Sequence, residues 1–257
     1  MTEESHRRTQ SGRVYSAPPR SGPPRRAAVG ATQRGSSLEQ LSDRRVASRV
    51  SLPSTAYPAV KRFVDVVGSS LFLVLLSPLL IGIGVAIALE TGFPILYRCE
   101  RLGQHGRKMT ALKFRTMRDG SHHHLQELLR NDEEARLEYE KNRKLRDDPR
   151  RTRVGTVLRR TSLDELPQLW NVLMGHMSLI GPRPYFLNEL EAFPEATAIL
   201  SVRPGITGLW QVSGRSNVPL ERRVALDTQY VRERGYRLDA RIALRTFGAV
   251  ISGRGAY

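Results

Sequence analysis

Apolar residues are most concentrated between Val66 and Leu89, which predicts a long hydrophobic helix. As a helix, this run would extend roughly 36 Å, enough to cross a bilayer core of about 30 Å. Ser77-Pro78 lies at its centre, and proline removes a backbone donor and clashes with the preceding turn. The run is therefore expected to break there, which lipid tolerates if Ser77 or a neighbour satisfies the freed carbonyl.

Basic residues flank the apolar run on both sides. Lys61 and Arg62 precede it, and a second group follows it, made of Arg98, Arg101, Arg107 and Lys108. Because Lys and Arg favour the cytoplasmic side of a membrane, both ends of the run are expected on that side. We therefore predict a re-entrant membrane helix over about 61–90. A kinked single span and a buried core helix are the alternatives.

The remaining part, about 91–257, consists of short periodic segments separated by Gly- and Pro-rich loops. Segments 95–97 and 109–114 indicate two strands joined in a hairpin. A charged amphipathic helix is expected from Leu125 to about Lys144, and further helices are expected over 164–174, 186–200 and 219–234. The predicted fold class is mainly α with a small β-hairpin element, joined to the broken membrane helix.

Residues 1–57 are rich in Arg, Ser, Pro and Gly and show almost no apolar periodicity. Such a composition cannot bury enough apolar surface to offset chain entropy, so we predict a disordered basic tail. The tail is solvated or contacts anionic lipid headgroups. No apolar segment lies within the first thirty residues, so no secretory signal is expected. One domain is then expected over 58–257.

The formal net charge is +16, which favours an anionic partner such as nucleic acid, anionic lipid or a phosphorylated substrate. The tail holds ten Lys and Arg against four Asp and Glu, a net of +6, so +10 belongs to residues 58–257. The basic character is therefore not confined to the tail. A single cysteine, Cys99, excludes an internal disulfide and fits a reducing compartment.

Asp164-Glu165 is the first candidate for chemistry. With Asp164 as the N-cap of the helix predicted over 164–174, its carboxylate would be held ionised by the helix dipole and free N–H groups. An aspartate held in this way is a usable nucleophile toward phosphorus. The alternative is structural, because Ser162 and Glu165 match a capping box and an Asp near a helix start is common.

The same two acids can hold a divalent cation. Mg²⁺ takes one or two carboxylates, completes its shell with phosphate oxygens and keeps several waters, so two adjacent acids suffice. The run His122-His123-His124 could suggest a transition-metal site. No second cluster with ligand spacing accompanies it, and a polar loop or helix start is the preferred interpretation.

Several arginines lie where they could bind phosphate. Arg183 stands between two prolines whose fixed φ angles present its side chain at low entropic cost. Guanidinium groups match phosphate oxygens bidentately, and further candidates lie close in sequence to glycine, proline or the acidic pair: Arg159, Arg160, Arg203 and Arg215. Each could also be a solvated surface arginine. Trp210 and Gln211 could stack on a base or sugar, anchor at a membrane interface or fill a core.

Taken together, these segments resemble the bacterial sugar transferase family, the monotopic polyprenol-phosphate phosphoglycosyl transferases. The resemblance covers roughly 58–257. The chain is most similar to the short members, which lack a four-helix membrane extension. It rests on several motifs in order: Lys61-Arg62-x-x-Asp65, Ser77-Pro78, Lys113-Phe114-Arg115-Thr116-Met117, residues 159–171, Met177 through Pro184, Val202 through Arg215, Asp227-x-x-Tyr230-Val231 and Gly253 through Tyr257.

This resemblance implies a reaction. Members transfer a sugar-1-phosphate from a nucleoside diphosphate sugar to undecaprenyl phosphate, release the nucleoside monophosphate and need Mg²⁺. The family's nucleophile maps onto Asp164 and its acidic neighbour onto Glu165, and the pair would also hold the metal. Residues expected to bind substrate are Lys113, Arg115, Arg159, Arg183, Arg215 and Asp227.

The resemblance also implies a place in the cell. Members lie in the cytoplasmic leaflet of the inner membrane on a re-entrant helix, with a cytoplasmic interfacial catalytic domain, here about 91–257. The reaction would be the first membrane step of exopolysaccharide or glycoconjugate assembly. The motif Gly208 through Arg215 resembles members that move hexose-1-phosphates, so a UDP-hexose is the expected donor. Membrane lipid and downstream glycosyltransferases are the other candidate partners.

Two non-enzymatic functions compete with this interpretation. The high pI would suit a membrane-tethered nucleic-acid-binding protein, but the sequence contains no helix-turn-helix, zinc finger or RNA-binding strand motif. No nucleic acid partner is therefore expected. A membrane-tethered basic scaffold, in which Asp164 only caps a helix, would tolerate alanine there with a loss of about 1 kcal/mol in stability.

Overall fold

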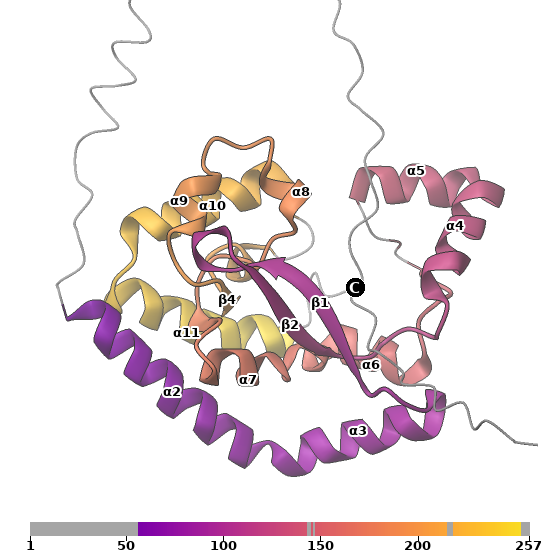
Figure 1. The fold of residues 1–257 in the computed structure, drawn as a ribbon, viewed down its shortest axis with the longest axis horizontal. Helices are drawn as coiled ribbons and strands as arrows, with labels where there is room; N and C mark the ends of the chain where they lie inside the picture. The colour runs from indigo at the N-terminus through magenta and orange to yellow at the C-terminus, as the bar shows by residue number, and fades with distance from the viewer. Residues whose placement is uncertain (1–55, 143–144, 146, 215–217, 253–257) are drawn as a thin grey trace, which may run out of the picture.

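The computed structural model describes residues 56–142, 145, 147–214 and 218–252, which form a mainly helical fold with two small sheets (Figure 1). The mainly α fold class with a small hairpin is thereby confirmed. The tail predicted over 1–57 lies outside the described residues, apart from its last two positions.

The hydrophobic run forms two helices, α2 (Tyr57–Leu75) and α3 (Ser77–Thr91), bent by 61° with respect to each other. Ser77 Oγ donates a hydrogen bond of 2.8 Å to the Val74 carbonyl, which is the oxygen that Pro78 leaves without its helical donor. The predicted break and the predicted role of Ser77 are both confirmed. Neither helix alone has the length and hydropathy of a membrane span, whereas the bent pair together passes that test.

Many large apolar side chains of this bent pair are exposed, among them Phe63, Leu71, Val74, Leu75, Ile81 and Leu89. The polar side chains at the start of α2 point the other way and tie it to the rest of the protein. Lys61 Nζ donates to Asp239 Oδ2 at 2.7 Å, and Arg62 donates to the Val172 and Leu173 carbonyls at 2.6 and 2.8 Å. Both basic residues therefore fasten α2 to neighbouring helices.

The predicted hairpin is present as β1 (Leu96–Leu102) and β2 (Lys108–Phe114), paired antiparallel from Leu96↔Phe114 to Leu102↔Lys108. The turn η1 (Gln104–Gly106) reverses the chain through left-handed backbone at His105 and Gly106. Asn171 bonds to β2, accepting from the Leu112 N–H and donating to the Thr110 carbonyl. This amide fixes the hairpin to the helix that carries Asn171, α7 (Gln168–Leu173).

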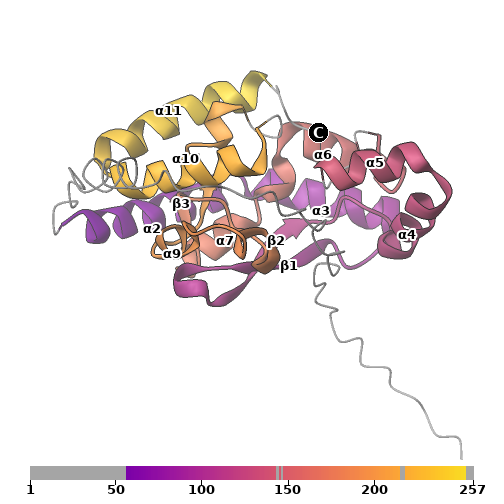
Figure 2. The same cartoon turned by 90° about the horizontal axis from the view of Figure 1, so that it is seen from above.

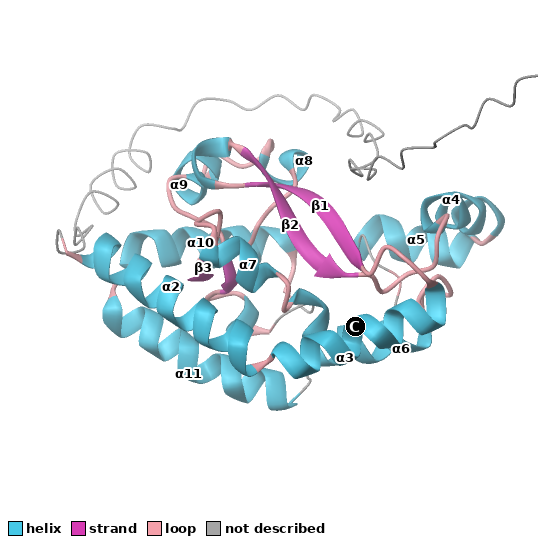
Figure 3. Ribbon diagram, turned by 60° about the horizontal axis from the view of Figure 1, so that its bottom comes forward, coloured by secondary structure: helices cyan, strands magenta, loops and turns pink. Residues whose placement is uncertain are grey.

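A second sheet, which the sequence pattern did not indicate, pairs β3 (Ser178–Ile180) in parallel with β4 (Gly205–Thr207). The backbones approach closely because the crossing points are glycines. A Cβ at Gly205 would lie 2.1 Å from the Gly181 nitrogen, and one at Gly208 would lie 2.1 Å from the Gly181 carbonyl oxygen. In Figures 2 and 3, α7 and β3 lie between the hairpin and α11 (Tyr236–Ser252), another element that the pattern did not predict.

Two predicted helices are wrong in their continuity. The helix expected from Leu125 to about Lys144 is split into α4 (Ser121–Asn131) and α5 (Glu133–Asn142), because Asp132 is extended and its carboxylate accepts from the Ala135 N–H. The helix expected over 186–200 consists of α8 (Leu187–Leu190) and α9 (Ala196–Leu200), with Pro194 in the interruption.

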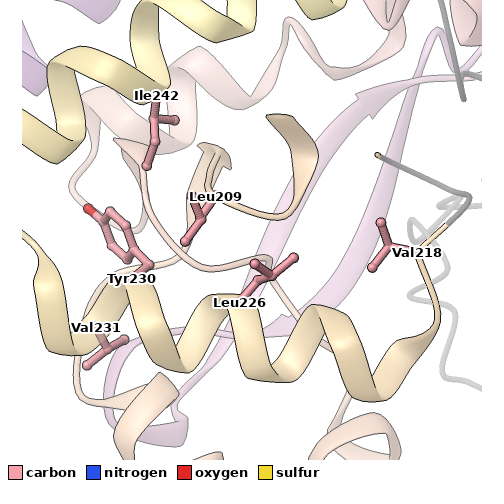
Figure 4. Packing of buried hydrophobic residues seen from close by; sticks show 6 residues of the cluster. All are labelled: Leu209, Val218, Leu226, Tyr230, Val231 and Ile242. Carbon is pink, nitrogen blue, oxygen red and sulfur yellow. The ribbon is translucent and has the colours of Figure 1, made fainter. Parts of the chain in front are cut away.

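The helix predicted over 219–234 is confirmed as α10 (Leu220–Glu233). It packs with α11 and with η3 (Gln211–Ser213) around one of the apolar clusters of the protein. Figure 4 shows the buried members of this cluster, Leu209, Val218, Leu226, Tyr230, Val231 and Ile242. The cluster gives α10 a fixed position, from which Asp227 faces the neighbouring loops.

Candidate active site

The acidic pair lies in a short 3-10 turn, η2 (Leu163–Glu165), that connects α6 (Arg153–Thr161) to α7. The chain reverses at Ser162, which is left-handed at φ 61°. The predicted cap is wrong, because Pro167 occupies the N-cap of α7 and Ser162 makes no side-chain cap bond. The turn nevertheless presents Asp164 and Glu165 next to the end of α6.

Helix α6 is fixed at its N-terminus from two sides. Thr152 accepts from the Gly155 N–H, and Glu90, at the end of α3, accepts from the Arg153 and Val154 N–H groups at 2.7 and 3.0 Å. These bonds satisfy donors that a helix start leaves free. Because α6 ends directly before the acidic turn, its anchoring also fixes the turn relative to the hydrophobic helix pair.

Four of the predicted site residues meet at this turn. Lys113 Nζ on β2 lies 2.5 Å from Glu165 Oε1, and Arg159, in the last turn of α6, donates to Thr116 Oγ1 at 3.1 Å. Burial is the main cause that raises the pKa of Asp164 to about 6, and the negative charge of Glu165 adds to it. The positive charges of Lys113 and Arg159 lower this pKa, Lys113 more strongly. The carboxylate of Asp164 thus lies between cations that favour its ionised form.

Arg115 is placed differently. Its guanidinium is buried and donates to the Thr91 and Gly92 carbonyls at 2.6 and 2.5 Å and to Asp119 at 3.2 Å. These are the contacts of a side chain that caps the C-terminus of α3. Substrate binding by Arg115 stays a prediction, and its observed contacts tie the hairpin to the hydrophobic helix pair.

The Pro182-Arg183-Pro184 turn is supported from α10. Asp227 is fully buried, and its Oδ2 accepts from the Arg183 N–H at 3.0 Å and from the Tyr185 hydroxyl at 2.8 Å. Burial raises the pKa of Asp227 to about 7, against these two hydrogen bonds and the charges of Arg183 and Arg223. Asp227 therefore holds the turn from inside, and the substrate contact predicted for it stays a prediction.

Two further predictions have separate outcomes. Arg215 lies outside the described residues. The histidine run begins α4, and no group of three or more His, Cys, Asp or Glu side chains with metal-ligand geometry occurs in the described part of the chain. Mg²⁺ does not need such a group, since two carboxylates with phosphate and water suffice. The donor set of Asp164 and Glu165 therefore fits this metal.

Sequence reasoning missed the residues that position the site. Glu90 and Asn171 contact backbone groups of α6 and β2 and lie in segments that were interpreted as a membrane helix and a helix interior. Their partners are main-chain atoms distant in sequence, so no local pattern marks them. A longer-range signal would be needed to find them.

Known proteins resemble this chain over most of its length. The UDP-galactose-lipid carrier transferase of Erwinia amylovora is 46% identical over 199 residues, which are 77% of this chain and 42% of that protein. ExoY of Rhizobium meliloti, an exopolysaccharide production protein, is 44% identical over 77% of this chain and 88% of its own. The UDP-glucose:undecaprenyl-phosphate glucose-1-phosphate transferase of Caulobacter vibrioides is 39% identical over 80% of this chain and 75% of its own.

The chain thus spans about two fifths of the Erwinia relative and most of the other two. The sequence profile described as "bacterial sugar transferase" matches residues 56–253, which include the bent helix pair, the hairpin, the acidic turn and the Pro-Arg-Pro turn. With this match, the chain belongs to the bacterial sugar transferase family.

Proposed function

We propose that the protein transfers a sugar-1-phosphate from a UDP-hexose to undecaprenyl phosphate, giving undecaprenyl-diphosphate-sugar and UMP. The observation that carries the proposal is the meeting of Asp164 and Glu165 with Lys113 and Arg159 at one turn. The names of the Erwinia and Caulobacter relatives, which specify a lipid carrier and a UDP-hexose, support the two substrates. ExoY supports a role in exopolysaccharide production.

We propose two displacements at phosphorus. An oxygen of Asp164 attacks the phosphorus that bears the sugar, the bond to the nucleotide oxygen breaks, and UMP leaves with the electron pair. A phosphate oxygen of undecaprenyl phosphate then attacks the same phosphorus, and the bond to Asp164 breaks. Lys113 and Arg159 favour the ionised nucleophile, and both can stabilise negative charge on the transferred group.

Asp164 and Glu165 are the residues that would hold Mg²⁺. When bound, the metal would neutralise charge on the leaving nucleotide. Glu165 pairs with Lys113 in the structure, so this lysine also holds the glutamate beside the nucleophile. Arg183 is a further arginine proposed to bind substrate phosphate, and its turn is fixed by Asp227.

We place the protein on the cytoplasmic face of the inner membrane, with α2 and α3 as a re-entrant helix pair. The exposed apolar side chains of both helices support insertion, and the basic residues around them support cytoplasmic ends. Arg115 and Glu90 link α3 to β2 and α6. An insertion of α3 would therefore hold the acidic turn close to the headgroup level, where the phosphate of the lipid acceptor lies.

The test separates the two displacements. Purified protein in nanodiscs is mixed with UDP-galactose, UDP-glucose or N-acetylated UDP-sugars and Mg²⁺, and UMP is counted with and without undecaprenyl phosphate. We expect at most one UMP per protein without acceptor, continuous release with it, and no release when EDTA removes the metal. Continuous release without acceptor would indicate a hydrolase. No UMP from any donor, with folded protein, would overturn the proposed reaction.

A further inference from the structure

A second group of cations lies away from the acidic turn. The Arg101 guanidinium, on β1, stacks 3.2 Å above the ring centroid of Phe186. Arg183 lies 5.4 Å from the ring of Tyr185 and 5.9 Å from that of Trp210. Aromatic faces hold planar guanidinium groups in place without neutralising their charge.

The charges in this group do not balance. Arg183 pairs with Glu189 at 3.1 Å, whereas the Arg101 guanidinium donates a hydrogen bond of 3.0 Å to the Glu100 carbonyl. Burial lowers the pKa of Arg101 most, Cys99 opposes this change, and the charge of Arg183 lowers the pKa again, against a smaller opposing effect of Glu189. Holding two cations together with one carboxylate is unfavourable unless another anion joins them.

A third guanidinium lies beside the same aromatic ring. Arg223, on α10, lies 4.9 Å from the same Trp210 ring that Arg183 approaches. Asp227 lies on the same helix as Arg223, and burial raises its pKa to about 7, so that it carries only part of a charge near neutrality. The cluster of Arg101 and Arg183 is therefore positive, because Glu189 compensates one of its two charges, and its aromatic neighbours keep it partly out of water.

The position of this cluster relative to the acidic turn follows from the hairpin register. Lys113, which pairs with Glu165, stands opposite Tyr97, and Arg101 lies four residues further along β1. Residues at even spacing share one face of a strand, so Arg101 and Lys113 lie on the same face. A strand rises about 3.3 Å per residue, which separates their positions by roughly 13 Å.

We propose that Arg101 and Arg183 form a second anion subsite, which binds a phosphate group of a substrate that is not the group under attack. The inference rests on the proposed function, because both substrates of that reaction carry phosphate. Two guanidinium planes held by Phe186, Tyr185 and Trp210 are pre-organised for phosphate oxygens. The bound phosphate is either that of the nucleotide or that of the lipid acceptor, and the experiment distinguishes them.

The kinetic test compares Arg101→Gln with Arg98→Gln, which removes the same charge from an exposed position three residues away on β1. We expect Arg101→Gln to raise KM about tenfold or more for one substrate, as for a lost charge-assisted hydrogen bond, with kcat changed less than about threefold. A raised donor KM assigns the nucleotide phosphate, and a raised undecaprenyl phosphate KM assigns the acceptor. Unchanged KM values for both would overturn the subsite.

If Arg101 had a purely structural role, its substitution would lower thermal stability without raising the KM of one substrate alone. Arg101→Lys, which keeps the charge and loses the planar fork, is the second variant if Arg101→Gln does not fold. It is expected to raise the same KM by a smaller factor. A loss of stability with equal effects on both KM values would also overturn the subsite.

A binding measurement separates this inference from the proposed function. UDP and undecaprenyl phosphate are added singly, without a second substrate, and the thermal unfolding midpoint is measured. We expect one of them to raise the midpoint of wild type and Arg98→Gln but not of Arg101→Gln. If wild type releases no UMP, the proposed reaction fails, yet this ligand-dependent difference would still assign the subsite. Equal midpoint gains in all three proteins would overturn it.

Discussion

Asp164 and Asp227 are aspartates of one protein in opposite settings. Asp164 is partly open, in a short turn after a left-handed residue, and faces Lys113 and Arg159. Asp227 is fully buried in the middle of α10, where a backbone N–H and a tyrosine hydroxyl bind one of its oxygens. Burial raises the pKa of both carboxyl groups, to about 6 and about 7.

The contrast shows that a raised pKa does not identify a catalytic acid on its own. The groups around Asp164 are side-chain cations, Lys113 and Arg159, and both are partly exposed. The groups around Asp227 are parts of the fold that already use its Oδ2. Access and the partner atoms therefore decide which aspartate can react and which one supports the Pro-Arg-Pro turn.

The largest expected effect separates the two residues by activity. Asp164→Asn should lower the rate of UMP release by about 10⁴-fold or more, the order seen when a covalent nucleophile is removed. Its thermal midpoint should stay equal to wild type or rise, because a partly buried charge disappears. Asp119→Asn, at an exposed acid on the neighbouring loop, is the matched control. Turnover within tenfold of wild type would exclude Asp164 as the nucleophile.

Asp227→Ala should act mainly on stability. It leaves the Arg183 N–H and the Tyr185 hydroxyl without their acceptor in a buried region, which costs about 3 kcal/mol. For a protein of this size, that lowers the thermal midpoint by about 6–12 °C. The measurement is thermal unfolding in nanodiscs at pH 6, with Asp119→Ala as the control. Equal midpoints for the two variants would show that Asp227 does not hold the turn.

The pH dependence of Asp227 gives a smaller effect with a defined sign. Its pKa rises from an ordinary 3.8 to about 7 on folding, so the folded state binds more protons between about pH 4 and 7. The free energy of unfolding therefore falls as pH rises through this window, by at most about 1.4 kcal/mol per pH unit. Asp227→Asn can still accept the Arg183 N–H and does not titrate.

The stability of Asp227→Asn relative to wild type should accordingly increase from pH 5 to pH 8. Thermal midpoints of both proteins over this range test the sign. Asp164 contributes a slope of the same sign up to about pH 6 in both proteins, so it cancels in the difference. A difference that is constant with pH would mean that burial does not raise the pKa of Asp227.

The sequence was sufficient for elements whose signal is local. The proline at position 78 removes a donor within its own helix, and the break appears there with Ser77 as the substitute donor. The hairpin follows from two short strand-like segments and a glycine-containing turn. The parallel pair of β3 and β4 has three residues in each strand, too few for a period, and its real signal is the spacing of close-contact glycines.

The site divides in the same way. The acidic pair and its arginines were identified from a motif, but the motif was given the wrong local geometry, since Pro167 caps α7 instead of Asp164. The meeting of Lys113 with Glu165 joins residues 52 positions apart, and no periodicity encodes it. Arg101 was interpreted as a flanking charge because its aromatic partner, Phe186, is even more distant in sequence.

The smallest effect expected in this comparison comes from Tyr185→Phe. The change removes one of the two donors to Asp227 Oδ2 and keeps the ring, so the loss should be about 1 kcal/mol and kcat should stay within about threefold of wild type. The hydroxyl also lowers the pKa of Asp227, so its removal should extend the pH-dependent loss of stability to higher pH. The measurement is again the thermal midpoint from pH 5 to pH 8.

Tyr230→Phe is a matched control. It removes a buried hydroxyl from α10, the helix that also carries Asp227, but this hydroxyl binds Ile180 and Asp239 instead of Asp227. It should lower the thermal midpoint without moving the pH range over which the protonation of Asp227 changes stability. If Tyr185→Phe and Tyr230→Phe displaced the pH curve equally, the hydroxyl of Tyr185 would not act through Asp227. A shift confined to Tyr185→Phe would show that Asp227 is tuned by its fixed neighbours, whereas Asp164 remains the aspartate that can react.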